Sequence, residues 1–153
     1  MNKILYYIVI VSLFFLGSCT TPQRSGVELP GEDPQKTVLP DKNTSPAVIS
    51  LIEKARIATQ QGDYQRAEVL LERTVHIEPR NASLWHYLAK LRLHQSRYQD
   101  AVGLAQKSSY LAGANNKLKA DNWRIIAHSR QQMGDQAGAM QAQDKARRFA
   151  GQH

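Results

Sequence analysis

The chain has 153 residues, a formal net charge of +7 and a single cysteine, Cys19. One cysteine excludes an intramolecular disulfide, so any folded part of the chain must be stabilised by packing alone. The positive charge by itself would suit a nucleic-acid partner. The first twenty residues of the chain, however, indicate export from the cytoplasm and therefore argue against that class of partner.

The N-terminus has the order of parts found in a signal peptide. Lys3 provides a basic tip, residues 4–16 form an apolar run of 13 residues, and small residues follow. This run is shorter than the roughly 20 residues that span a bilayer as a helix, so a transmembrane anchor is the weaker alternative. The quartet Leu16-Gly17-Ser18-Cys19 resembles the lipobox of bacterial lipoproteins, in which the cysteine is acylated. We expect residues 1–18 to be a signal peptide and Cys19 to carry the lipid anchor, the alternative being an unmodified thiol.

Residues 19–46 are expected to form a disordered linker behind the acylated cysteine. Five of the six prolines lie here (Pro22, Pro30, Pro34, Pro40 and Pro46), and the stretch 20–46 has three basic and four acidic groups. It cannot bury enough apolar surface to offset its ordering entropy. Its 27 residues reach at most roughly 90 Å. Ser45-Pro46 then predicts an N-cap followed by proline at the first helical position, which begins a folded domain over 47–153.

The folded domain repeats itself. Tyr64 recurs as Tyr98 after 34 residues, and Trp85 recurs as Trp123 after 38 residues. A 34-residue period with aromatic, alanine and glycine markers is typical of the tetratricopeptide repeat. The sequence is identified as a member of that family, which implies an all-α fold, a right-handed superhelix of three helix-turn-helix repeats. The repeats are expected at about 48–81, 82–115 and 120–153.

Two departures from the repeat have structural consequences. Four extra residues separate the second and third repeats, which is close to one helical turn. Asn115 or Asn116 can therefore cap a third A helix (the first helix of a repeat) that starts one turn early. The last helix is polar, with Gln141, Gln143, Arg147 and Arg148 among its residues, so we expect it to close the core against water, as terminal repeats do.

No catalytic motif is present. The sequence lacks paired cysteines, HExxH, a glycine-rich phosphate loop and a GxSxG elbow. His86, Lys90 and His94 are spaced by four residues on one helical face, which places the two histidines about 12 Å apart, too far to share a metal. We therefore expect no enzyme activity, no metal site and no cofactor.

The family resemblance implies that the A helices line a concave groove where ligands lie. Carried over, the groove positions are Ile49, Ile52, Arg56, Thr59 and Gln60, then Ser83, His86, Lys90, Leu93 and His94, then Asp121, Arg124, His128, Gln131 and Gln132. The predicted partner-binding set consists of the cationic or proton-binding members: Arg56, His86, Lys90, His94, Arg124 and His128. Such a row of cationic groups can bind acidic side chains of a partner. The alternative is that these residues form a solvated helix face without a partner. The asparagines of the family's carboxylate clamp are absent, which argues against a clamp for a chain terminus.

The architecture resembles the LpoP-type peptidoglycan-synthase activators, short lipoproteins with a disordered arm and a small tetratricopeptide domain. The resemblance implies a non-catalytic adaptor that reaches from the periplasmic face of the outer membrane to a bifunctional, class A penicillin-binding protein. Thr20 after the cysteine favours the outer membrane, since an aspartate there would resemble an inner-membrane retention signal. The alternatives are a pilotin-like assembly factor for a pilus or secretion complex, and a structural lipoprotein that binds acidic cell-wall polymer.

Overall fold

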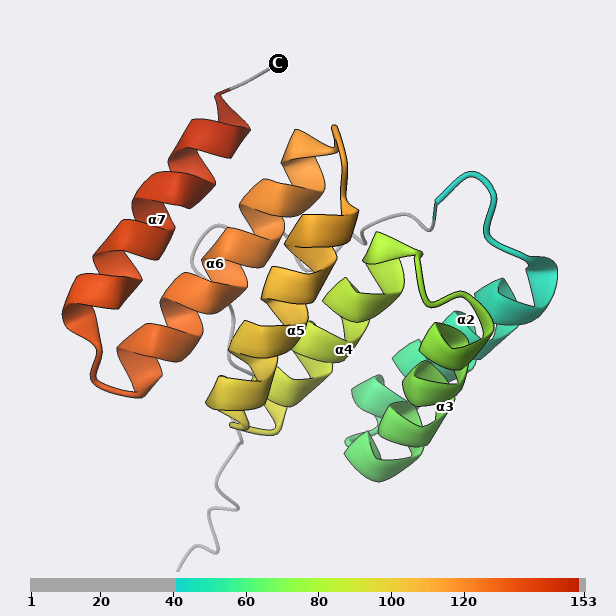
Figure 1. Cartoon of the computed structure of the whole chain (residues 1–153). Helices are drawn as coiled ribbons and strands as arrows, with labels where there is room; N and C mark the ends of the chain where they lie inside the picture. Colours follow the sequence, from blue (N-terminus) through green and yellow to red (C-terminus); the bar gives the residue numbers. More distant parts are fainter. Residues whose placement is uncertain (1–40, 152–153) are drawn as a thin grey trace, which may run out of the picture.

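The computed structural model describes residues 41–151. The signal peptide, Cys19 and the linker up to residue 40 lie outside those residues. Within the described part the chain forms six helices and no strand: α2 (Pro46–Gln60), α3 (Tyr64–Ile77), α4 (Ala82–His94), α5 (Tyr98–Leu111), α6 (Asn116–Gln132) and α7 (Gln136–Ala150). Figure 1 shows them side by side as three hairpins, from α2 and α3 at one end to α6 and α7 at the other. The prediction of an all-α fold of helix-turn-helix repeats is confirmed.

Local sequence signals set the helix starts. The Ser45 hydroxyl accepts a hydrogen bond from the Val48 backbone N–H, and Pro46 is the first residue of α2, as the Ser-Pro pair predicts. Asn115 caps α6 by accepting a hydrogen bond from the Leu118 N–H at 3.0 Å. The third A helix therefore begins one turn early and runs for 17 residues, which the four-residue insertion predicts.

The turns within the repeats need a residue with positive φ. Gly62 and Gly134 have φ of +76° and +82° in the first and third repeats. In the second repeat the equivalent residue is Ser96, with φ of +59°. Glycine adopts this left-handed conformation without steric cost, whereas serine carries a Cβ that crowds the following carbonyl. The middle turn is thus the strained one of the three.

The core consists of two buried clusters that share α4. The first joins α2, α3 and α4 through residues such as Val48, Leu71 and Leu84, and the second joins α4 to α7 through residues such as Leu93 and Ile125. Alanines are fully or almost fully buried where the helices approach closely: Ala55, Ala67, Ala89, Ala101 and Ala105. The small side chains allow the close helix contacts that the repeat requires.

The two tryptophans pack against these clusters and are only partly buried. Lys107 lies over the Trp85 ring at 5.8 Å, and Lys145 lies over the Trp123 ring at 4.2 Å, measured to the ring centroid. The lysines occupy equivalent positions on α5 and α7. The second and third repeats thus each cover their tryptophan with a cation from their own second helix. The indole faces are structural rather than open platforms for stacking a ligand.

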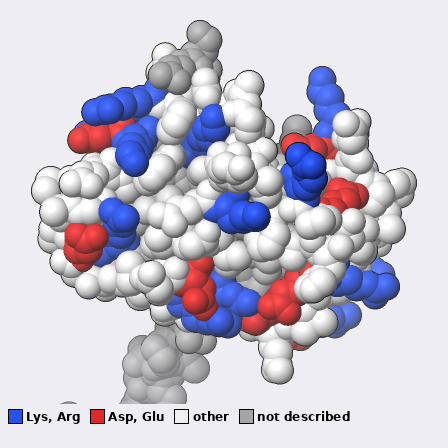
Figure 2. Space-filling model, viewed as in Figure 1, with Lys and Arg blue, Asp and Glu red and all other residues white. Residues whose placement is uncertain are grey.

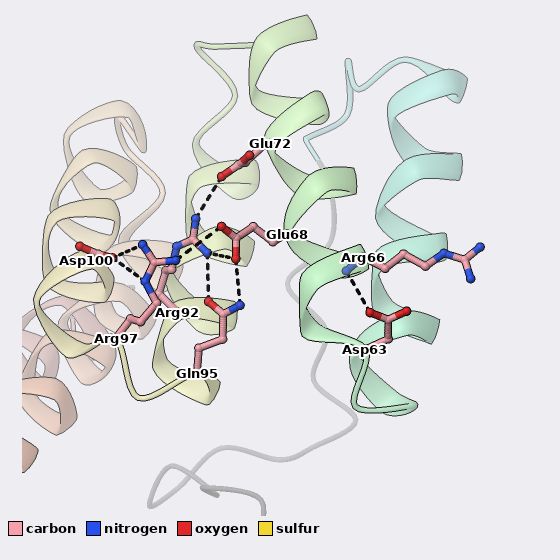
Figure 3. Close-up of polar contacts among 8 residues, drawn as sticks. All are labelled: Asp63, Arg66, Glu68, Glu72, Arg92, Gln95, Arg97 and Asp100. Atoms are coloured by element: carbon pink, nitrogen blue, oxygen red, sulfur yellow. Dashed lines mark hydrogen bonds and ion pairs between the residues drawn. The ribbon is translucent and has the colours of Figure 1, made fainter.

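A polar network joins the first repeat to the second (Figure 3). Arg92 on α4 forms ion pairs with Glu68 and Glu72 on α3, the latter at 3.0 Å between Nη2 and Oε1, and its side chain is only 8% exposed. Gln95 donates a hydrogen bond to Glu68 at 2.9 Å. The hydrogen bond from Arg92 lowers the pKa of Glu68, and that from Gln95 adds to the effect. The network satisfies a buried guanidinium and ties α3 to α4.

Candidate partner-binding groove

The predicted cationic residues begin with Arg56 on α2, which is exposed. Its guanidinium forms an ion pair with Glu53, three residues earlier, at 2.6 Å. Each group shifts the pKa of the other: the Arg56 hydrogen bond lowers the pKa of Glu53, and the Glu53 hydrogen bond raises that of Arg56. Both side chains are roughly half exposed. The pair presents a charged but locally neutralised spot at the first repeat.

His86 does not line an open groove, which corrects the expectation drawn from its position in the repeat. Its side chain is fully buried, and Nδ1 donates a hydrogen bond to Oδ1 of Asn122 on α6 at 2.8 Å. Asn122 donates to the Ser108 hydroxyl at 2.7 Å, and that hydroxyl donates to the Ala82 carbonyl at 2.9 Å. This chain joins α4, α6 and α5, so His86 is a structural residue at the junction of the second and third repeats.

Ser83 and Leu93, two further groove positions, are also buried, with exposures of 1% and 2%. The reason is the same as for His86. The next A helix packs against α4 and covers these positions, because α4 contacts α6 as well as α5. In a short solenoid the middle A helix therefore offers less open surface than the repeat pattern suggests.

Lys90 and His94 also lie on α4, and both are partly buried. The His94 ring stacks on Tyr64, with ring centroids 6.4 Å apart and an angle of 7° between the planes. Tyr64 is the first residue of α3, so this stack contributes to the contact between the first and second repeats. His94 is therefore held against Tyr64 and is only partly exposed.

Arg124 and His128 are the two predicted residues that the fold brings to the same pocket. The pocket has a volume of about 290 Å³ and lies between α6 and α7. Its lining residues are Arg124, Ala127, His128 and Gln131 on α6, with Gln136, Ala139, Met140 and Gln143 on α7. Arg124 forms an ion pair with Asp121, one turn earlier on α6. We call this pocket the terminal groove.

His128 differs from the cationic residues in its charge. Burial lowers the pKa of its imidazole below the ordinary value of 6.5. The Nε2 atom is buried and makes no hydrogen bond within residues 41–151. His128 is therefore neutral at pH 7. The predicted ladder of cations is interrupted at His86 and His128, and its charged members are Arg56, Lys90 and Arg124.

Two buried polar networks and the terminal groove were not predicted from the sequence. The Arg92 network and the His86–Asn122–Ser108 chain use polar residues at positions that the repeat makes buried. Polar residues at such positions are themselves the available signal, because a buried polar group requires a partner. The terminal groove was also missed, since it depends on how α7 lies against α6.

Other kinds of site find no support in the described residues. Across residues 41–151, no three His, Cys, Asp or Glu side chains gather closely enough to hold a metal ion. None of the helices α2 to α7 is long and apolar enough to cross a membrane. Figure 2 shows basic and acidic side chains interspersed on the visible face, with neutral surface between them. That face does not present one continuous basic patch.

The helical hairpins and the surfaces along them define a repeat protein of the type that binds other proteins. Residues 58–113 match the sequence profile of the tetratricopeptide repeat family. The globular C-terminal domain of LpoP from P. aeruginosa is similar in structure, with a TM-score of 0.66 and 32% identity, over 67% of this chain and 97% of that domain. The chain therefore belongs to the tetratricopeptide-repeat family and is a relative of the LpoP domain.

A second solved structure shows the fold alone. The N-terminal domain of stress-induced protein-1 from C. elegans has a TM-score of 0.63 and 18% identity, over 67% of this chain and 84% of that one. No curated protein sequence matches the chain.

Proposed function

We propose that the protein is a lipid-anchored envelope adaptor that binds and activates a class A penicillin-binding protein. The observation that carries the proposal is the 32% identity over 97% of the LpoP domain. The lipobox resemblance at Cys19 and the proline-rich stretch before residue 46 supply the anchor and the tether of the same architecture. Anchoring on the periplasmic face of the outer membrane follows from the same resemblance.

The physical role of the domain is recognition rather than chemistry. Helical repeats present an extended surface on which another protein can lie. The cations Arg56, Lys90 and Arg124 on the A helices suit carboxylates on that partner. Because two of these cations already form ion pairs with carboxylates of the same helix, a partner carboxylate would exchange for or share those contacts.

The test is direct binding between the full-length lipoprotein in detergent and a purified class A penicillin-binding protein. Wild type is compared with the single variants Arg56→Glu, Lys90→Glu and Arg124→Glu, with circular dichroism confirming that each folds. We expect wild type to bind and at least one charge reversal to weaken binding tenfold or more. No binding by folded wild type would contradict the proposal. In a parallel pull-down from solubilised envelopes, capture of pilus or secretion components in place of a synthase would favour the assembly-factor alternative.

Binding to acidic cell-wall polymer is distinguished by salt. Attraction between the +7 chain and a polyanion is screened at high ionic strength. A shape-matched protein contact depends less on long-range charge. We expect binding to the synthase to persist at a salt concentration that releases the protein from isolated cell-wall polymer.

A further inference from the structure

By its position in the repeat, the terminal groove is equivalent to a surface of the second repeat, on α4 and α5, that α6 covers. The second and third repeats are offset by 38 residues, as the pairs Trp85 and Trp123 show. Moving each groove residue back by 38 gives His86, Ala89, Lys90, Leu93, Tyr98, Ala101, Val102 and Ala105. Six of these are buried, and five of them belong to one apolar cluster with Ile125 of α6.

This correspondence identifies the kind of occupant. In the second repeat, the equivalent surface of α4 and α5 receives α6, which inserts Ile125 and bonds His86 through Asn122. In the third repeat, the equivalent residues of α6 and α7 line an open pocket instead. The buried alanines Ala127 and Ala139 form its floor, with exposures of 7% and 9%. The groove therefore fits an α-helix.

The side chains around the floor differ in chemistry from those of the second repeat. Leu93, Tyr98 and Ala105 are replaced by Gln131, Gln136 and Gln143. Met140 replaces Val102 and is 66% exposed. Amide groups donate hydrogen bonds to carboxylates, and an exposed methionine adapts to an apolar side chain. The groove thus suits an amphipathic helix rather than a wholly apolar one.

The charge around the groove indicates the net charge of the helix that fits there. Residues 116–151 contain seven Lys and Arg side chains and three Asp side chains. Arg124 lines the groove, and Arg147 lies one turn beyond Gln143 on the same face of α7. Each arginine is held by an aspartate three residues earlier, Asp121 or Asp144. Two positioned guanidinium groups complement an acidic helix.

A second copy of the chain is a poorer occupant. It would have to present α2, because α2 is the first A helix of the solenoid. The charged residues of α2 are Glu53, Lys54 and Arg56, so a positive helix would face a positive groove.

We propose that the terminal groove receives an amphipathic helix of the protein partner, with carboxylates of that helix bound by Arg124 and Arg147. This deepens the proposed function, on which it rests, by naming the contact surface and the chemistry of the partner segment. The contact is at the open end of the solenoid, between α6 and α7.

The test places a photo-crosslinking amino acid at Gln143 of the full-length lipoprotein in living cells and identifies the crosslinked peptide by mass spectrometry. We expect a helix of another envelope protein that carries at least two acidic residues. A crosslink to residues 20–40 of the same chain, to a second copy, or to nothing would overturn the groove proposal. A crosslink to an acidic helix of a protein other than a synthase would support the groove and contradict the synthase proposal.

A binding measurement gives the matched comparison. The variant Met140→Glu with Gln143→Glu puts two carboxylates into the groove at exposed helix positions. Its control, Gln65→Glu with Val69→Glu, likewise introduces two carboxylates, on α3, where Val69 is 63% exposed. We expect at least a tenfold loss of affinity for the purified synthase in the groove variant and less than twofold in the control. If wild type binds the synthase and the groove variant binds it with the same affinity, the groove proposal is overturned and the synthase proposal stands.

Discussion

Nδ1 of His86 on α4 donates a hydrogen bond to Oδ1 of Asn122 on α6 at 2.8 Å, and both side chains are fully buried. With Ser108 and the Ala82 carbonyl this contact forms a chain that runs in one direction, each donor meeting an acceptor. This buried chain of three hydrogen bonds fixes how the second and third repeats dock, because any shift would leave several polar groups without partners.

Replacing Asn122 with alanine removes the acceptor of His86 and the donor to Ser108. We expect Asn122→Ala to lower the free energy of unfolding by about 2–4 kcal/mol, since buried groups lose their partners. Urea unfolding followed by circular dichroism measures this. Ser83→Ala is the control, because the Ser83 hydroxyl is buried and makes no hydrogen bond within the described residues. That variant should be neutral or more stable, and a loss equal to that of Asn122→Ala would contradict the account.

Ser96 offers a stabilising change. Its φ of +59° places a serine where the first and third repeats have glycine. We expect Ser96→Gly to raise the free energy of unfolding by about 0.5–1 kcal/mol. Relief of the Cβ strain, roughly 1–2 kcal/mol for a left-handed residue, is partly offset because glycine adds chain entropy to the unfolded state. Thermal unfolding of the two proteins measures it. A lower melting temperature for Ser96→Gly would show that the turn is not strained.

His128 predicts a dependence of stability on pH. Burial lowers its pKa in the folded state below 6.5, so the unfolded chain binds the proton more readily. The free energy of unfolding therefore falls as the pH drops below about 6.5. We expect His128→Gln to reduce this loss between pH 7.5 and 5, measured by urea unfolding at each pH. Identical pH profiles for the variant and wild type would contradict the assignment.

Cys19 carries the prediction of a lipid anchor. Cells grown with a clickable fatty acid should label the wild-type protein, and Cys19→Ala should remove the label, because acylation requires the thiol. The mature wild-type chain should also begin at residue 19, which tests the predicted cleavage site. Wild-type protein without label would contradict the lipidation proposal while leaving the folded domain unaffected.

Short-range signals predicted most of the fold. Ser45-Pro46 located the start of α2, and the pair Asn115-Asn116 located the early start of α6, because capping depends on a few neighbouring residues. Gly62 and Gly134 stand where the turns of the first and third repeats have positive φ, the conformation that glycine adopts without steric cost. Each of these features can be recognised from a residue and its immediate sequence context.

The binding surface was harder to predict because it depends on contacts between repeats. His86 has the same repeat position as Ile52 and Arg124, yet it is buried because Asn122 of the following helix covers it. Arg124 lacks such a neighbour among residues 41–151 and lines a pocket instead. One position in the repeat thus gives a core residue in the middle of the solenoid and a surface residue at its end.

We propose that this protein activates a peptidoglycan synthase. The most direct test is the rate of glycan polymerisation by a purified class A penicillin-binding protein, with and without equimolar full-length lipoprotein in detergent. We expect a several-fold increase with wild type and little increase with the Met140→Glu, Gln143→Glu variant. An unchanged rate with folded wild-type protein would contradict it.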